Sequence, residues 1–197
     1  MKKIITLLFA AAIFASCAKE KNTAPANQTA LKITVTTASG TPVANAIVTL
    51  YSSSTDWENL VNALDSRVTG ADGTATFTAL QAKKYYWFAR NDCFTNGFNT
   101  VSSAGPITIN VTNTASTKIE QTGQLVFNNK SANPYQVYIN GVSSFEVPGN
   151  TIKTLKYKPA GFYTLRVLQL SGYVITPTDL TYTGTLACGG SLTTMFP

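Results

Sequence analysis

The chain has 197 residues, contains no histidine, and carries 15 Lys and Arg against nine Asp and Glu, a formal net charge of +6 at pH 7. Without histidine, Ser-His-Asp and Cys-His nucleophilic systems and every metal site with an imidazole ligand are excluded. The positive charge is spread thinly along the chain, so we expect no nucleic-acid partner.

The first residues have the pattern of an export signal. Lys2 and Lys3 precede the uncharged segment IITLLFAAAIFA, which at twelve residues is too short to span a bilayer of about 30 Å. The sequence FASC that follows resembles the lipobox of bacterial lipoproteins, in which the signal peptide is cut just before a cysteine that then carries acyl chains. The resemblance implies a signal peptide over residues 1–16 and a lipidated Cys17, whose acyl chains, palmitate among them, would hold the protein in a membrane.

The segment after the cysteine is predicted to be a flexible tether. Residues 17–29 are polar, contain Pro25 and show no apolar periodicity. Ala18, rather than an aspartate, follows Cys17, and the resemblance to well-studied Gram-negative sorting implies transfer to the outer membrane. We therefore expect a protein anchored by lipid in the outer membrane of a Gram-negative bacterium, on either its cell-surface or its periplasmic face.

Beyond the tether, the composition is typical of an all-β protein. Thr, Val, Tyr, Phe and Gly are frequent, turn residues recur about every ten positions, and no long segment has helical periodicity. We predict two small antiparallel β-sandwich domains with Greek-key, transthyretin-like or immunoglobulin-like topology. They cover residues 30–114 and 122–197, with a linker over 115–121.

Alternating and continuous apolar residues predict the strands of the first unit. Segment 31–35 alternates between apolar and polar residues, as a half-buried strand does, and 46–51 is predicted as a second strand. Residues 66–69 lead into the turn GADG, which is followed by a predicted strand at 74–78. KYYWFAR at 84–90 is aromatic on both faces, as in a central strand covered on both sides. The closing strand is predicted at Ile107, Ile109 and Val111.

One short helix is expected in this unit, within TDWENLVNALD. Thr55 and Glu58 have the spacing of a capping box. Glu58 and Asp65 would then share a helix face about 10 Å apart, near the upper limit for an inverting glycosidase pair. We favour a solvated helix face over that catalytic role. The apolar stripe at helical spacing consists of Trp57, Leu60, Val61 and Leu64.

The order GTPVANAIVTLY, TGADGTATFTAL and YYWFA resembles the carboxypeptidase regulatory-like family of transthyretin-like β-sandwiches. The resemblance implies a stalk or accessory domain of exported proteins and outer-membrane receptors, without catalytic residues. The unit is also similar to stalk domains with an internal Lys-Asn isopeptide, which would join Lys32 and Asn110 with Glu58 as catalyst. Alternation argues against that bond, because Lys32 and Asn110 would point away from the core face.

The second unit shows further strand and hairpin signals. Apolar alternation predicts strands near 125–127, 135–139 and 163–167, and Asn140 with Gly141 is a typical hairpin turn. GQLVFNNKSANPYQVYING followed by PAGFYTLRVLQLSGY resembles the PEGA type of small surface β-domain, and this resemblance also implies no catalytic residue. Lys156 and Lys158, two residues apart, are interpreted as protection of a strand edge.

Besides Cys17, the chain has two cysteines, Cys93 in the first unit and Cys188 in the second. An even pair in an oxidising compartment favours a disulfide. This bond would close a loop of roughly 95 residues and fix the two units as one body. The alternative is that each cysteine is a small buried side chain in its own core.

These observations predict a non-enzymatic lipoprotein, without cofactor or metal, that presents two β-sandwiches for structural, adhesive or protein-binding purposes. Two alternatives stay open: a glycan-binding surface module, and an accessory subunit of an outer-membrane receptor that would bind an envelope protein. The glycan hypothesis depends on the loop 91–105, where aromatic and amide side chains alternate. Its candidate ligand-binding residues are Phe94, Asn96 and Phe98.

Overall fold

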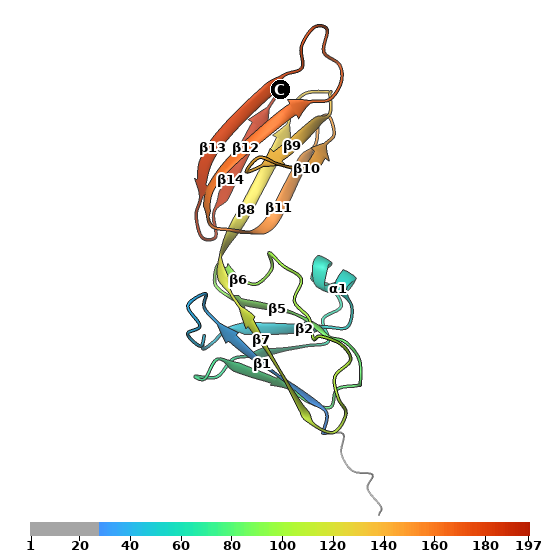
Figure 1. Cartoon of the computed structure of the whole chain (residues 1–197), viewed down its shortest axis with the longest axis vertical. Coiled ribbons are helices and arrows are strands. Elements are labelled where there is room, and N and C mark those ends of the chain that lie inside the picture. Colours follow the sequence, from blue (N-terminus) through green and yellow to red (C-terminus); the bar gives the residue numbers. More distant parts are fainter. Residues whose placement is uncertain (1–27) are drawn as a thin grey trace, which may run out of the picture.

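The computed structural model describes residues 28–197, which form two β-sandwich units stacked end to end (Figure 1). The all-β prediction with one short helix is confirmed. The predicted signal peptide, Cys17 and most of the predicted tether lie outside the described residues. Thr29, the last residue of that tether, belongs to the fold, because it is buried and its Oγ1 accepts a hydrogen bond from the Asn110 N–H. Within residues 28–197, no helix is long and apolar enough to cross a membrane.

The first unit consists of two sheets that face each other. In one, β1 (Ala30–Thr36) lies between β4 (Thr74–Phe77), which is antiparallel to it, and β7 (Thr112–Lys118), which is parallel. The other has the order β3 (Asp65–Val68), β2 (Ile47–Tyr51), β5 (Tyr86–Asn91) and β6 (Phe94–Thr95).

Side chains from both sheets form the first core. The alternate residues of β1 are fully buried, and β5 buries side chains on both of its faces, as its aromatic sequence predicted. The burial of these residues removes apolar surface from water and stabilises the unit. The largest members of this core are Leu31, Ile33, Leu50, Phe77, Tyr85, Trp87 and Ile119.

The helix α1 (Ser54–Asn59) is shorter than predicted and has a different cap. Ser53, rather than Thr55, is the N-cap, and its Oγ accepts a hydrogen bond from the Asp56 N–H at 3.1 Å. The Ser53 hydroxyl also donates to the Asp56 carboxylate, and Asn62 donates to it as well. These hydrogen bonds hold the pKa of Asp56 below its ordinary value.

Because α1 ends at Leu60, which adopts a left-handed conformation, the predicted apolar stripe does not form. Trp57 is buried, whereas Val61 and Leu64 are exposed. Asp65 begins β3 and pairs with Arg67 at 2.8 Å, so Glu58 and Asp65 do not share a helix face.

The strand that closes the first unit is β7, so the prediction at 107–111 was wrong. Ile107 is buried, but Ile109 and Val111 are about half exposed, and β7 begins after them. Its sequence, TNTASTK, is polar, and of its residues Thr117 is buried and Asn113 and Ala115 are half-buried. The prediction depended on apolar alternation, which this edge strand lacks.

The second unit repeats the sandwich plan with different strands. β8 (Glu120–Asn129) pairs with β11 (Ile152–Pro159) and with β14 (Ser191–Phe196). The facing sheet has the order β10 (Val142–Val147), β9 (Tyr135–Ile139), β12 (Gly161–Gln169) and β13 (Asp179–Leu186). The predicted Asn140-Gly141 hairpin joins β9 and β10, and both of its residues have positive φ. The buried core consists of Leu125, Phe127, Tyr135, Val137, Val147, Tyr163, Leu165, Val167, Leu186 and Phe196.

The segment 115–121, predicted as a linker, is instead strand in the structure. Only Ile119 separates β7 from β8, and it is buried in the first core with its N–H donating to the Thr36 carbonyl at 2.9 Å. The first two residues of β8 pair with β6, and the following residues pair with β11. The chain therefore passes from one unit to the other as nearly continuous strand (Figure 1).

Candidate functional site at the junction of the two units

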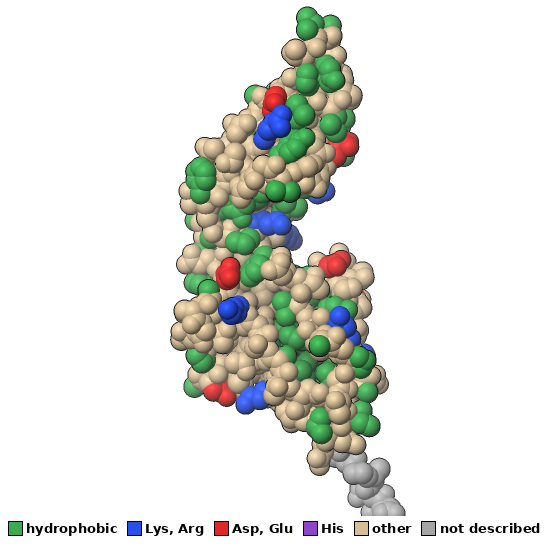
Figure 2. Space-filling model, in the orientation of Figure 1, with side chains coloured by type: hydrophobic (Ala, Val, Ile, Leu, Met, Phe, Trp, Pro, Cys, Tyr) green, Lys and Arg blue, Asp and Glu red, His purple; other side chains and the backbone are tan. Residues whose placement is uncertain are grey.

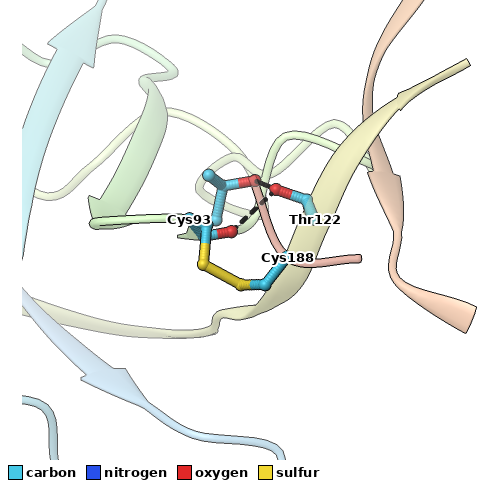
Figure 3. The surroundings of a disulfide bond; sticks show 4 residues. Cys93, Thr122 and Cys188 are labelled. Atoms are coloured by element: carbon cyan, nitrogen blue, oxygen red, sulfur yellow. Dashed lines mark hydrogen bonds between the residues drawn. A yellow bond between two sulfur atoms is a disulfide. The ribbon is translucent and has the colours of Figure 1, made fainter. Parts of the chain in front are cut away.

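A disulfide between Cys93 and Cys188 joins the two units, in agreement with the favoured prediction (Figure 3). Cys93 lies in the tight turn between β5 and β6, and Cys188 lies in the loop between β13 and β14. Their Cα atoms are 5.5 Å apart, an ordinary separation for a disulfide. The bond therefore links loops that are 95 residues apart in the sequence.

Thr122 connects the same two loops by hydrogen bonds, of which Figure 3 shows the one from its hydroxyl to Cys93. Its N–H and its hydroxyl both donate to the Cys93 carbonyl, at 2.9 and 3.0 Å. The Thr122 carbonyl accepts from the Gly189 N–H at 2.8 Å, and the hydroxyls of Thr95 and Thr122 are 3.1 Å apart. Because Thr122 is buried, these bonds are shielded from water and hold the β8 backbone against both loops.

Tyr157 extends from the second unit into an aromatic cluster of the first. It lies at a bulge of β11 with a positive φ of 55°, and its ring centroid is 5.0 Å from that of Phe88. Gly97 lies beneath this contact, and a Cβ there would come within 2.8 Å of both rings, so only glycine fits. The cluster is formed by Tyr51, Trp57, Leu60, Tyr86, Phe88 and Tyr157.

A hydrogen bond fixes the aromatic cluster to the first unit, and burial affects the ionisation of one of its tyrosines. The Trp57 Nε1 donates to the Trp87 carbonyl at 2.8 Å, which ties α1 to β5. The pKa of the Tyr51 hydroxyl is raised, first by burial and then by its proximity to Tyr157.

Figure 2 shows the notch between the units, and three open hollows lie at the junction. One of about 490 Å³ lies where the chain crosses between the units, between Phe94 and Pro159. The other two lie near Tyr157. The first, about 370 Å³, lies beside the disulfide. The second, about 360 Å³, separates α1 from β11, with Glu58 on one wall and Lys156 and Lys158 on the other. β11 is an edge strand of its sheet, which agrees with the edge-protecting interpretation of these lysines. The first hollow is lined by Asp92, Cys93, Thr95, Thr122, Gly123, Gln124, Lys156, Tyr157, Gly189 and Gly190.

Of the three residues predicted to bind glycans, Asn96 has a structural role. Asn96 is 1% exposed, and its Oδ1 accepts from the Ala89 N–H at 2.8 Å. Its Nδ2 donates to the Trp87 carbonyl and to the Thr117 hydroxyl, which ties β5 to β7. Phe94 packs against the first core, and Phe98 is half-buried. The three residues therefore do not form the exposed aromatic and amide surface that the hypothesis required.

The remaining sequence-based candidates are placed as follows. Cys17 lies outside the described residues. The Lys32 Nζ is 4.0 Å from the Asp72 carboxylate, so this lysine faces the β1–β4 side rather than Asn110. No group of three or more His, Cys, Asp or Glu within 28–197 could hold a metal ion.

Sequence reasoning missed Thr122 and Tyr157. A lone threonine in a strand and a tyrosine among lysines carry no local signal for a contact between domains. Only the pairing of Cys93 with Cys188 indicated that these regions meet.

No family model matches the chain, and no curated protein matches it. Among solved structures, it is similar to the TIE protein of Bacillus anthracis, with 19% identity and a TM-score of 0.34 over 86% of this chain. It is also similar to a streptococcal ancillary pilin (12%, TM-score 0.38, 88% of this chain) and to GBS52, a minor pilin of Streptococcus agalactiae (17%, TM-score 0.32, 85%). This chain spans 33% of the TIE protein and 63% of the ancillary pilin, which is less than two thirds of each. It spans 94% of GBS52. TM-scores this low establish neither a family nor a function.

Proposed function

We propose that this protein is a membrane-anchored, non-enzymatic lipoprotein whose two β-sandwiches act as one rigid body in a structural or adhesive role. The observation that carries the proposal is the construction of the junction. A disulfide, a nearly continuous strand, a buried threonine and an inserted tyrosine connect the same two units. Inter-domain contacts ordinarily permit relative motion, whereas four connections of different kinds between the same two units support a fixed geometry.

The two stacked units form a rod, and the end at which the chain enters it supports a spacer role. The chain enters the described fold at the end of the first unit farthest from the second (Figure 1). An anchor at Cys17 would therefore place the first unit nearest the membrane and the second unit farthest from it. A stiff body of this kind holds its distal loops at a defined height, where they are available to a partner.

The alternatives have less support. The glycan hypothesis depended on Asn96 and its neighbours, and the Asn96 amide is fully engaged in the core. Binding to an envelope protein, as an accessory subunit of a receptor would do, is compatible with the rod and would use the same distal loops.

Fractionation of cells that produce the wild type or the Cys17→Ala variant tests the anchor. We expect the wild type in the outer-membrane fraction, where it incorporates a palmitate analogue, and the variant in the soluble fraction without label. Membrane association that survives the loss of Cys17 would contradict lipid anchoring.

Protease treatment of intact cells then tests the direction of the rod. A blot for residues 122–197 follows the distal unit, and lysed cells show that the folded protein can be cut. Loss of the epitope in intact cells means exposure to the outside, and loss only after lysis means a periplasmic location.

A further inference from the structure

The loop between β12 and β13 carries the most exposed apolar side chains of the described chain. Val174 is 98% exposed and Ile175 is 87% exposed. This loop, residues 170–178, forms the far end of the second unit, and Figure 2 shows hydrophobic side chains at that end. Leu170 and Tyr173 on the same loop are also exposed. Val142, Ile152, Phe162 and Met195 elsewhere in the second unit are also exposed, but at 61–67% they are less exposed than Val174 and Ile175.

The base of this loop is fixed by a buried glutamine. Gln169 is 8% exposed, and its Nε2 donates to the Ser171 carbonyl at 2.8 Å while its Oε1 accepts from the Thr178 N–H at 3.1 Å. One side chain thereby bridges both ends of the loop. Gly172, at positive φ, lies against the Asn133 side chain with no room for a Cβ. The hydrogen bonds of Gln169 and the close contact at Gly172 therefore fix the base of the loop and leave its apolar tip pointing outward.

The tip itself carries no charged side chain, and the Arg166–Asp179 pair at its base combines two opposite charges. The loop sequence LSGYVITPT contains no ionisable acid or base except the Tyr173 phenol. Two neighbouring loops, 130–134 and 148–151, lie at the same end, as shown by hydrogen bonds from Leu170 to Pro134 and from Asn150 to Ser131. Lys130 is the one charged side chain that these three loops contain. With one ion pair and one lysine, this end has little net charge, and its most exposed groups are apolar.

We propose that this distal tip, residues 170–178, inserts into a lipid bilayer at the end of the rod opposite Cys17. A convex apolar tip needs no complementary pocket to enter a bilayer, because acyl chains adapt to its shape. Val174 and Ile175 would enter the acyl boundary, and Tyr173 would lie at the level of the headgroups, where amphipathic aromatic residues are favoured. This surface goes beyond the proposed function, since it supplies a second membrane contact that is independent of the lipid anchor.

The near-neutral surroundings also define the kind of bilayer. Binding through apolar area alone does not require anionic lipid and is insensitive to salt, unlike binding through a basic patch. We therefore expect similar affinity for vesicles of phosphatidylcholine alone and for vesicles with added phosphatidylglycerol.

Vesicle co-sedimentation of residues 18–197 tests the proposal. This form keeps every described strand and omits Cys17, so its result does not depend on lipid anchoring. The wild type should sediment with both vesicle types at low and high salt. A Val174→Asp/Ile175→Asp double variant should lose about tenfold or more in bound fraction, because each substitution replaces an inserted apolar group by a charge.

The matched control is Val142→Asp, a residue of the same unit that is 67% exposed and follows the Asn140-Gly141 turn. It should bind as the wild type does, and circular dichroism should show all three proteins equally folded. Equal sedimentation of the wild type and the double variant would overturn the proposal. So would a wild type that stays in the supernatant with both vesicle types, an outcome that would favour a protein pocket as the partner of the tip.

Discussion

Apolar side chains are buried at the junction of this molecule and exposed at its distal end. At the junction, Ile119 is buried in the first core and Tyr157 packs against Phe88. At the distal end, Val174 and Ile175 project into solvent from a loop whose base is fixed. The contrast separates two roles. Burial in the middle gives the rod its rigidity, and exposure at the end gives it a surface for interaction.

The largest expected effect is at the covalent link of the junction. A Cys93→Ser/Cys188→Ser variant should lose about 4 kcal/mol of unfolding free energy, because the disulfide closes a loop of 95 residues in the unfolded chain. Urea denaturation followed by tryptophan fluorescence and by far-UV circular dichroism measures the loss. Both tryptophans, Trp57 and Trp87, lie in the first unit, so the two signals also show whether the units unfold together. A loss below about 1 kcal/mol would show that the other contacts already fix the junction.

A Tyr157→Ala variant tests the non-covalent part of the junction. It removes a half-buried ring that packs against Phe88, and we expect a loss of about 2 kcal/mol. The matched control is Tyr138→Ala, on β9 away from the junction, whose ring stacks with the Arg166 guanidinium at 4.9 Å. Its loss should be below about 1 kcal/mol. Equal losses in the two variants would mean that Tyr157 contributes no more than an ordinary surface tyrosine.

The N-cap of α1 provides a smaller perturbation of the same region. Ser53→Ala removes the side-chain acceptor for the Asp56 N–H, at a cost of about 1 kcal/mol. Because α1 supplies Trp57 to the junction cluster, the near-UV signal of that residue should change as well. Ser53→Asn, which can still cap the helix, should keep most of the stability, and a loss equal to that of alanine would contradict the capping role.

The smallest expected effect is at the base of the distal loop. The Arg166 guanidinium binds the Asp179 carboxylate through two hydrogen bonds and lowers the pKa of this aspartate. A lowered carboxyl pKa gives stability that is complete above the unfolded-state pKa and is lost as the pH falls through the folded-state pKa. Because the pair is exposed, acidification should remove only a few tenths of a kcal/mol of its contribution.

The Asp179→Asn variant should lack that part of the pH dependence, measured by urea denaturation between about pH 6 and pH 2. A large loss in the wild type over this range, absent from the variant, would show that the loop base depends on charge rather than on Gln169.

Much of the fold could be predicted from short-range patterns, and the failures share one cause. Alternation in β1, the aromatic faces of β5 and the Asn140-Gly141 turn are local signals, and the structure has each of them. The polar strand β7 carries no such signal, because its position is fixed by pairing with β1 rather than by its own side chains. In the predicted linker 115–121, residues 115–118 are strand because they pair with β1, and Glu120 and Gln121 because they pair with β6.

The candidate site was predicted only through its covalent bond. The two cysteines indicated a fixed joint because cysteine is easily recognised in a sequence and can form a covalent bond with another cysteine. Tyr157 and Thr122 act through contacts between segments far apart in the sequence, which no local pattern records. Asn96 shows the converse error: an amide between two phenylalanines suggested a ligand, but its hydrogen bonds hold together β5 and β7.

The most direct test of the central claim is the distance distribution between spin labels placed on the two units. Labels at Thr76→Cys on β4 and Thr183→Cys on β13, both exposed positions, report on the joint without touching it. Double electron-electron resonance should give one narrow distribution if the two sandwiches form one rigid body. A broad or multimodal distribution in the oxidised protein would contradict the account, because it would show that the units move relative to one another despite the disulfide.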